Sequence, residues 1–238
     1  MENRKLYIFG ASGHRKVITE LVANTNCKIE AFYDDAPNSD NFGLIPIFNS
    51  NEIVKPAADV ALIIAIGNNH IRKNISSRFS DYNFFRSVDK SAYVSTSATV
   101  GIGTVVMRSA IINAHAIIGN HVIINTAALI EHDCSIDDFV HISPNVTLSG
   151  NISIGLGSHL GSGAIVIPGV KIGKWCTIGA GTVVINDIPD GAKVVGNPGK
   201  INSYKNYPET SVIREKIRKK KKVIKINSEN LEYNTYQN

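Results

Sequence analysis

The chain of 238 residues has few of the features that mark membrane, secreted or disordered proteins. Its longest apolar run, residues 60–66, is far too short to cross a bilayer, and the N-terminus lacks the apolar segment and cleavage site of a signal peptide. Only three cysteines occur, and without a CxxC pair they fit a reducing cytoplasm better than a disulfide framework. With 43% hydrophobic and 19% charged residues, the sequence predicts a globular, cytoplasmic protein.

The net charge of +5 is concentrated at the C-terminal end. Residues 203–238 contain nine of the 25 Lys/Arg and four of the 20 Asp/Glu, which leaves sixteen of each in residues 1–202. This basic tail is either a solvated segment or a surface helix attracted to an anionic membrane or nucleic acid. We favour the solvated tail because its apolar face is narrow. Contact with a membrane surface stays open, and no nucleic-acid partner is expected.

Residues 1–90 are expected to form a Rossmann-like α/β domain. The predicted elements alternate, with strands at 5–9, 28–33 and 59–66 and helices at 15–24 and 70–79. Glycine-bearing turns follow the first and third strands, at residues 10–14 (GASGH) and 67–69 (GNN). Strands and helices in alternation favour a parallel sheet with helical crossovers.

Residues 91–202 carry a six-residue repeat. Every sixth residue from Val94 to Val184 is Val, Ile or Leu, at sixteen positions in succession without an insertion. The fourth residue after each anchor is mostly small or β-branched, and glycine often follows the anchor directly. The pattern predicts an all-β left-handed parallel β-helix of about five coils, with roughly eighteen residues per coil and the anchors stacked in one core. Glycine is expected to supply the corner conformations.

One histidine of the repeat has acidic residues on both sides. His132 lies between Glu131 and Asp133, two residues after an inward-facing anchor. Acyl transfer to an amine or a hydroxyl needs a base with a pKa near neutrality, and a carboxylate can orient the second nitrogen of an imidazole. His141 follows half a coil later, and we expect both histidines to face one lateral groove.

Other residues admit a structural and a chemical interpretation. His115 and His121 lie one hexad apart, as zinc ligands could, but the spacing of hexapeptide-repeat carbonic anhydrases is absent, so no metal is expected. Cys134 and Cys176 occupy inward positions and are interpreted as core residues.

The N-terminal glycine turn leaves two interpretations open. Gly10 and Gly13 could place a phosphate at a helix N-terminus, and Asp34-Asp35 could accept hydrogen bonds from a ribose or base. The turn is not a full dinucleotide fingerprint, so NAD binding is not expected. Turn chemistry with helix capping by Ser12 explains the same residues equally well.

Several motifs together resemble the NeuD/PglD-type bacterial sugar acetyltransferases, a hexapeptide-repeat family. They are YIFGASGH, FYDD, IAIGNNHIRK, NTAALIEHDCSIDDFVHIS and VVGNPGK, and they cover about residues 5–200. The resemblance is greatest to enzymes that acetylate the 4-amino group of a UDP-4-amino-4,6-dideoxy sugar. It implies a nucleotide-sugar-binding domain joined to the β-helix, acetyl-CoA as co-substrate, and a homotrimer whose active sites are shared between adjacent helices.

The resemblance also implies roles for individual residues. His132 corresponds to the general base, Asp133 to the acid beside it, and His141 to the histidine that contacts acetyl-CoA. The pantetheine channel corresponds to Gly161, Ser162, Gly179 and Ala180. The nucleotide-sugar site corresponds to Ser12, Gly13, His14, Asp34, Asp35, Gly67 and His70. This chain departs from the family pattern at three positions: Arg15 replaces a common glycine, His70 replaces an acidic residue, and Asp133 replaces a longer glutamate.

The expected function is direct N-acetylation of a nucleotide-linked 4-amino-4,6-dideoxy sugar by acetyl-CoA. Two alternatives stay open. The first is O-acetylation of a sugar of the sialic acid type, which would use the same base. The second is a non-catalytic β-helix that binds a nucleotide sugar.

Overall fold

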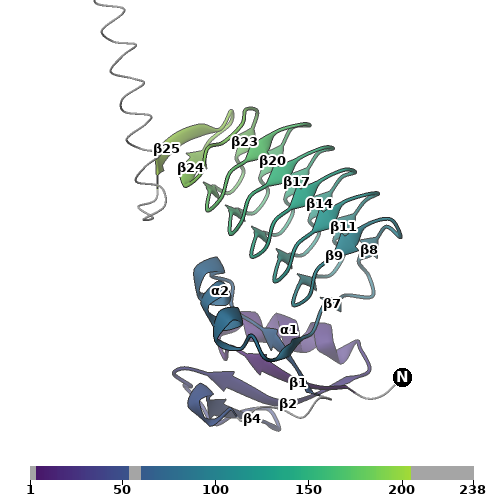
Figure 1. Cartoon of the computed structure of the whole chain (residues 1–238), viewed down its shortest axis with the longest axis vertical. Coiled ribbons are helices and arrows are strands. Elements are labelled where there is room, and N and C mark those ends of the chain that lie inside the picture. The colour runs from purple at the N-terminus through teal and green to yellow at the C-terminus, as the bar shows by residue number, and fades with distance from the viewer. Residues whose placement is uncertain (1–3, 54–59, 205–238) are drawn as a thin grey trace, which may run out of the picture.

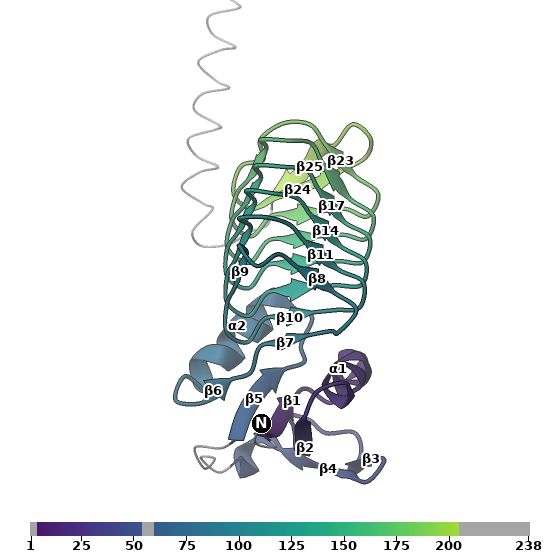
Figure 2. The same ribbon diagram turned by 90° about the vertical axis from the view of Figure 1, so that its right-hand side faces the viewer.

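The computed structural model describes residues 4–53 and 60–204, which form an α/β domain and a parallel β-helix. Figure 1 shows the β-helix inclined above the α/β domain, with α2 (Asn69–Arg78) lying against its side. In Figure 2 the coils stack above β1 (Arg4–Phe9) and α1 (Gly13–Ala23). The predicted fold class is therefore confirmed in both of its parts.

The α/β domain has a six-stranded sheet in the order β3-β4-β2-β1-β5-β6. Its other elements are β2 (Cys27–Asp34), β3 (Asn41–Phe42), β4 (Ile45–Asn49), a 3-10 turn (Ser50–Glu52), β5 (Val60–Ile64) and β6 (Asn83–Phe84). The central strand β1 pairs in parallel with β2 and β5, as predicted, whereas β3 and β4 form an antiparallel hairpin that the sequence did not indicate.

Two apolar clusters cover the two faces of this sheet. On one face α1 packs on Leu6 and Ile8, in a cluster that continues into Val105 and Ile123 of the β-helix. On the other face α2 contributes Ile75 to a second cluster. Because the first cluster includes residues from both domains, the α/β domain is attached to the β-helix by buried apolar surface.

The β-helix has three faces of short strands, which pair in parallel except that the last strand of the first face is antiparallel to its neighbour. The eight-stranded face contains β7 (Ser87–Val88), β10 (Val105–Val106), β13 (Ile123–Ile124), β16 (His141–Ile142), β19 (His159–Leu160), β22 (Thr177–Ile178), β24 (Ala192–Val195) and β25 (Lys200–Tyr204). The six-stranded face contains β8 (Tyr93–Val94), β11 (Ile111–Ile112), β14 (Leu129–Ile130), β17 (Thr147–Leu148), β20 (Ile165–Val166) and β23 (Val183–Val184). The five-stranded face contains β9 (Thr99–Val100), β12 (Ile117–Ile118), β15 (Ser135–Ile136), β18 (Ser153–Ile154) and β21 (Lys171–Ile172).

An eighteen-residue register joins the coils. Ile124, for example, pairs with Val106 of the preceding coil and with Ile142 of the next. The anchors stack in a single core that also contains Cys134 and Cys176, so both cysteines are core residues as predicted. Each coil thus buries its apolar side chains only together with its neighbours, which explains the unbroken repeat.

The glycines of the repeat differ from the expectation. From Val100 to Ile178, corners are made by the third residue after each anchor, which has a positive φ whether it is glycine, as at Gly163, or not, as at His121 and Asp133. The glycine directly after the anchor has another role. A Cβ on Gly161 would lie 2.6 Å from the backbone nitrogen of Ala180 in the next coil. These glycines are therefore required by the close approach of adjacent coils, not by corner conformations.

Among the described residues, no helix is long and apolar enough to cross a bilayer. The interpretation of the basic tail falls on residues 205–238, which lie outside the described part of the chain.

Candidate functional site

The first candidate region is the glycine turn at the carboxyl ends of the parallel strands. Gly10 has a φ of 111°, and a Cβ there would lie 2.9 Å from the carbonyl oxygen of Ala65, which follows β5. The Asp34 carboxylate, at the end of β2, accepts a hydrogen bond of 2.6 Å from the Ala11 amide. Ser12 stands at the N-cap of α1, but its side chain makes no capping hydrogen bond. The capping interpretation of Ser12 is therefore wrong, and the turn presents the Ser12 hydroxyl at an exposed helix N-terminus.

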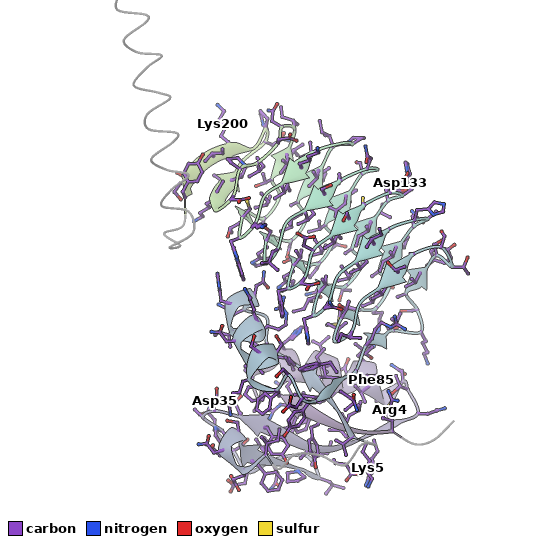
Figure 3. The ribbon with its side chains drawn as sticks, in the orientation of Figure 1. Arg4, Lys5, Asp35, Phe85, Asp133 and Lys200 are labelled. Atoms are coloured by element: carbon purple, nitrogen blue, oxygen red, sulfur yellow. The ribbon has the colours of Figure 1, made fainter. Side chains whose placement is uncertain are left out.

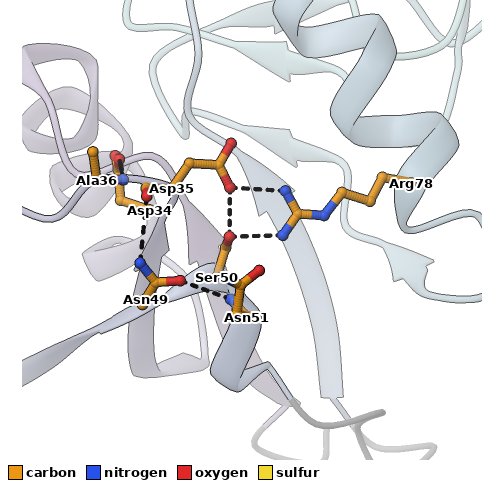
Figure 4. Close-up of polar contacts among 7 residues, drawn as sticks. All are labelled: Asp34, Asp35, Ala36, Asn49, Ser50, Asn51 and Arg78. Carbon is orange, nitrogen blue, oxygen red and sulfur yellow. Dashed lines mark hydrogen bonds and ion pairs between the residues drawn. The ribbon is translucent and has the colours of Figure 1, made fainter.

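Asp35, the neighbour of Asp34, is held by a different set of groups (Figure 4). Its carboxylate accepts a hydrogen bond from the Ser50 hydroxyl and an ion pair of 2.7 Å from Arg78, whose second terminal nitrogen donates to Ser50. The Ser50 and Arg78 hydrogen bonds lower the pKa of Asp35. The two aspartates thus differ, since Asp34 braces the glycine turn and Asp35 is engaged by Arg78.

The second region is the seam between Gly67 and the eight-stranded face of the β-helix. His141 Nδ1 lies 3.3 Å from the Gly67 carbonyl oxygen, and His141 Nε2 lies 3.3 Å from the amide nitrogen of Asn125. A carbonyl only accepts, so Nδ1 carries the proton and Nε2 accepts from Asn125. Burial and the neighbouring His159 ring, which stacks at 4.7 Å, lower the pKa of His141 to about 3. His141 is therefore uncharged at neutral pH.

A pocket opens at this seam, at the N-terminus of α2. It is lined by Gly67, Asn68, Asn69, His70, Gly157 and His159. Asn68 caps the helix by accepting hydrogen bonds from the His70 and Ile71 amides. His70 stacks on Trp175 of the β-helix with ring centroids 3.8 Å apart. The pocket thus combines two predicted nucleotide-sugar residues, Gly67 and His70, with His159, which the sequence did not single out.

The third region is an outer corner of the β-helix that carries His132. Its Nδ1 lies 2.8 Å from Asp133 Oδ2, and both side chains are more than half exposed. Asp133 occupies the positive-φ corner position. The imidazole lies over Gly150 of the next coil, where a Cβ would come within 2.7 Å of His132 Nε2. Glycine at this position makes room for the ring, and the pair is arranged to leave Nε2 as the proton acceptor.

A strip of small residues forms the corner that follows β19 and β22. Gly161 and Ser162 lie one coil from Gly179 and Ala180, and the Gly181 amide donates a hydrogen bond of 2.9 Å to the Ser162 carbonyl. The four predicted pantetheine residues thus form one continuous strip on adjacent coils.

These regions do not all meet within one chain. His132 follows β14 on the six-stranded face, whereas His141 lies in β16 of the eight-stranded face, which contacts the α/β domain. Half a coil therefore separates the two histidines across the prism, so one chain does not hold both in one groove. In Figure 3 Asp133 projects from the outer edge of the β-helix, far from Asp35 in the α/β domain. His132 and His141 thus belong to two separate regions of one chain.

Sequence reasoning missed two residues that shape these regions. Gly150 could have been found, because it follows His132 by one eighteen-residue coil. Arg72 carried no such signal, since its partners come from strands and loops far along the chain. As to metals, residues 4–53 and 60–204 contain no group of three or more His, Cys, Asp or Glu side chains placed to hold an ion.

Comparisons with known proteins agree across both domains. Residues 5–79 match the model of the PglD N-terminal domain. The UDP-N-acetylbacillosamine N-acetyltransferase of Bacillus subtilis is 42% identical over 111 residues, which are 44% of this chain and 51% of that protein. The chain thus matches about half the length of this curated relative.

Solved structures are similar over most of the chain. The acetyltransferase domain of PglB from Neisseria gonorrhoeae, in complex with acetyl coenzyme A, superposes with a TM-score of 0.78 at 38% identity, covering 84% of this chain and 100% of that one. PerB from Caulobacter crescentus, in complex with CoA and GDP-perosamine, gives a TM-score of 0.77 at 34% identity, covering 84% and 97%.

Proposed function

Because this chain belongs to the NeuD/PglD-type bacterial sugar acetyltransferases, we propose that it transfers the acetyl group of acetyl-CoA to the 4-amino group of a nucleotide-linked 4-amino-4,6-dideoxy sugar. The observation that carries the proposal is the pairing of His132 with Asp133 above Gly150. The pairing supports the proposal because the imidazole lies on an exposed corner of a fold whose relatives have been solved with acetyl coenzyme A and with GDP-perosamine.

In the proposed mechanism His132 acts as general base. Asp133 accepts a hydrogen bond from Nδ1–H and leaves the Nε2 lone pair free to take a proton from the amine. As the amine nitrogen bonds to the thioester carbonyl carbon, a backbone N–H of a neighbouring coil stabilises the developing oxyanion. The C–S bond then breaks, and the proton passes from His132 to the CoA thiolate.

A covalent acyl-enzyme on either cysteine of the β-helix is not expected. Burial raises the pKa of Cys134 and raises that of Cys176 to about 11, so both stay as thiols in the core. Transfer is therefore proposed to be direct, within a complex that holds both substrates.

The neighbouring regions have supporting roles in this proposal. The strip of Gly161, Ser162, Gly179 and Ala180 lines the pantetheine arm, and His141 contacts acetyl-CoA. The nucleotide sugar is bound by the glycine turn and the seam, through Ser12, Gly13, His14, Asp34, Asp35, Gly67 and His70.

The proposed assembly is a homotrimer with shared sites. Outward side chains of the six-stranded face are apolar along most of its length, and they include Tyr93, Ile111, Leu129, Ile165 and Val183. Such a face is typical of an interface between copies. Packing of the β-helices of adjacent protomers would bring the His132 corner of one protomer toward the seam of another. Such packing would bring together His132 and His141, which lie apart within one chain.

The test is release of free thiol from acetyl-CoA in the presence of a panel of acceptors. The panel contains UDP-, dTDP- and GDP-linked 4-amino-4,6-dideoxy sugars, with free sialic acid as the hydroxyl acceptor. We expect rapid release with one amino sugar. Release with sialic acid alone would replace the proposal by O-acetylation, and binding without release for every acceptor would indicate a non-catalytic protein.

A further inference from the structure

Among residues 4–53 and 60–204, Arg72 is the largest side chain that is almost fully buried, with 1% of its surface exposed. It lies on α2, on the helix face that contacts the β-helix. Burial lowers the pKa of its guanidinium to about 9, which leaves it charged at neutral pH. A buried charge costs free energy unless it is paired or hydrogen-bonded. We therefore expect the partners of Arg72 to show what its guanidinium does at this position.

The partners of Arg72 come from both domains. On the α/β side, one terminal nitrogen donates 2.9 Å to the Ile66 carbonyl and 3.3 Å to the Gly67 carbonyl. On the β-helix side, Nε donates 2.8 Å to the His121 carbonyl and the other terminal nitrogen donates 2.7 Å to the Phe139 carbonyl. All these partners are neutral oxygens, so the planar fork fixes two coils and one turn of chain in a single geometry.

Asn69, one helical turn before Arg72, extends the clamp. Its side-chain oxygen accepts 2.8 Å from Arg72, and its amide nitrogen donates 2.9 Å to the Gly157 carbonyl in the next coil. Three successive coils, at His121, Phe139 and Gly157, are therefore tied to one turn of α2.

The Gly67 carbonyl has a second partner, since His141 Nδ1 lies 3.3 Å from it. Arg72 thus touches the turn whose carbonyl orients the His141 ring. We propose that Arg72 is a positioning residue: by fixing the Gly67 turn against the β-helix, it sets the orientation of His141 and the shape of the nucleotide-sugar seam. The inference rests on the proposed function, which assigns His141 to acetyl-CoA and Gly67 to the sugar nucleotide.

The charge of Arg72 acts on the same histidine. Besides burial and His159, the nearby Arg72 and His14 lower the pKa of His141, and the Gly67 carbonyl opposes them. His141 therefore stays neutral at neutral pH, so Nδ1 donates to the Gly67 carbonyl while Nε2 can accept from the Asn125 amide. Arg72 thus influences His141 through both geometry and charge.

The test compares Arg72→Gln and Arg72→Lys with the intact protein. Both variants lack the planar fork, so we expect KM for both substrates to rise about tenfold or more while kcat changes less, because His132 lies at another corner. Only Arg72→Gln removes the charge, so the titration midpoint of His141, followed by NMR of the imidazole carbons, should move upward in that variant and stay low in Arg72→Lys. The matched control is Arg86→Gln, an exposed arginine that also donates to a β-helix carbonyl, that of Val100, at 2.6 Å.

The outcomes separate this inference from the proposed function. Folded Arg72 variants with unchanged KM values and an unchanged His141 titration would overturn the positioning role and leave Arg72 as a structural clamp. If the Arg72 variants do not fold, Asn69→Ala serves in their place, because it removes one hydrogen-bond acceptor of the guanidinium. It should raise KM less than the tenfold expected for the Arg72 variants, and an unchanged KM would overturn the inference. If the intact protein acetylates nothing, the proposed function fails, but the His141 titration still tests Arg72.

Discussion

The two regions that carry candidate chemistry are built in opposite ways. The outer corner holds His132 and Asp133, which are adjacent in sequence and exposed, and Gly150 of the next coil leaves room for the imidazole. The seam holds the buried Arg72 and the half-buried His141 and Gly67, and contacts between residues far apart in the chain join the seam to the β-helix. The corner therefore depends on local sequence, and its exposed side chains can be substituted with little effect on the fold. The residues of the seam have two roles, because they line the proposed substrate site and also attach the α/β domain to the β-helix. We expect corner variants to change kcat and seam variants to change KM and stability.

The largest expected effect is that of His132→Ala. Loss of a general base typically lowers turnover by about 10²–10⁴-fold, and the fold should be unaffected because the ring is exposed. Thiol-release kinetics measure turnover, and calorimetric titration with CoA measures binding, which should stay near normal. Full activity in this variant would show that His132 is not the general base and that the corner carries no chemistry.

Asp133→Asn should have the next largest effect, about ten- to a hundredfold in kcat. The amide can no longer hold the Nδ1–H tautomer as a carboxylate does. Asparagine is the appropriate replacement because Asp133 has a φ of 59°, which asparagine tolerates better than most residues. An unchanged kcat together with an unchanged pH profile would show that His132 acts without its neighbour.

Gly150→Ala tests whether the corner needs its supporting glycine. The new methyl group would lie 2.7 Å from His132 Nε2, so the ring must move, and we expect kcat to fall about tenfold with an unchanged KM for acetyl-CoA. Ser149→Ala, at the adjacent residue, is the matched control and should behave like the intact protein. Equal kinetics for both variants would mean that the ring position above Gly150 is not the reactive one.

The expected effect with the least consequence for activity belongs to the seam and concerns stability. Burial lowers the pKa of His121 to about 4, so between about pH 6.5 and 4 the unfolded chain binds more protons there than the folded one. Stability is therefore lost as the pH falls through this range. His121→Phe should remove about 2 kcal/mol of this loss at pH 5 and change little at pH 8, because Phe139 already occupies the same corner one coil later. Urea unfolding at both pH values measures the difference.

The control for that prediction is His115→Asn, which changes an exposed histidine at a comparable corner. It should keep the pH dependence of the intact protein. If His121→Phe keeps it as well, the acid sensitivity has another source.

The sequence predicted one region far better than the other. The anchors from Val94 to Val184 determine the coil, and the eighteen-residue register then places every corner, so the His132–Asp133 pair was predictable. The role of the repeat glycines was not, because close approach of coils depends on backbone spacing that no period reveals. The role of Arg72 could not be predicted for a related reason, since all of its partners except the Asn69 side chain are main-chain oxygens, which any residue type supplies.

The eighteen-residue register limits how this protein can change in length. An insertion of six residues between Gly161 and Gly179 would keep every aliphatic side chain inward, yet it would move all later corners to the next face and separate the two halves of the strip. Only eighteen residues, or a multiple, restore each corner to its own edge, and each such addition lengthens the prism by about 4.8 Å. Relatives of different length should therefore differ by whole coils, and insertions of any other size should occur as loops that leave the prism at a corner.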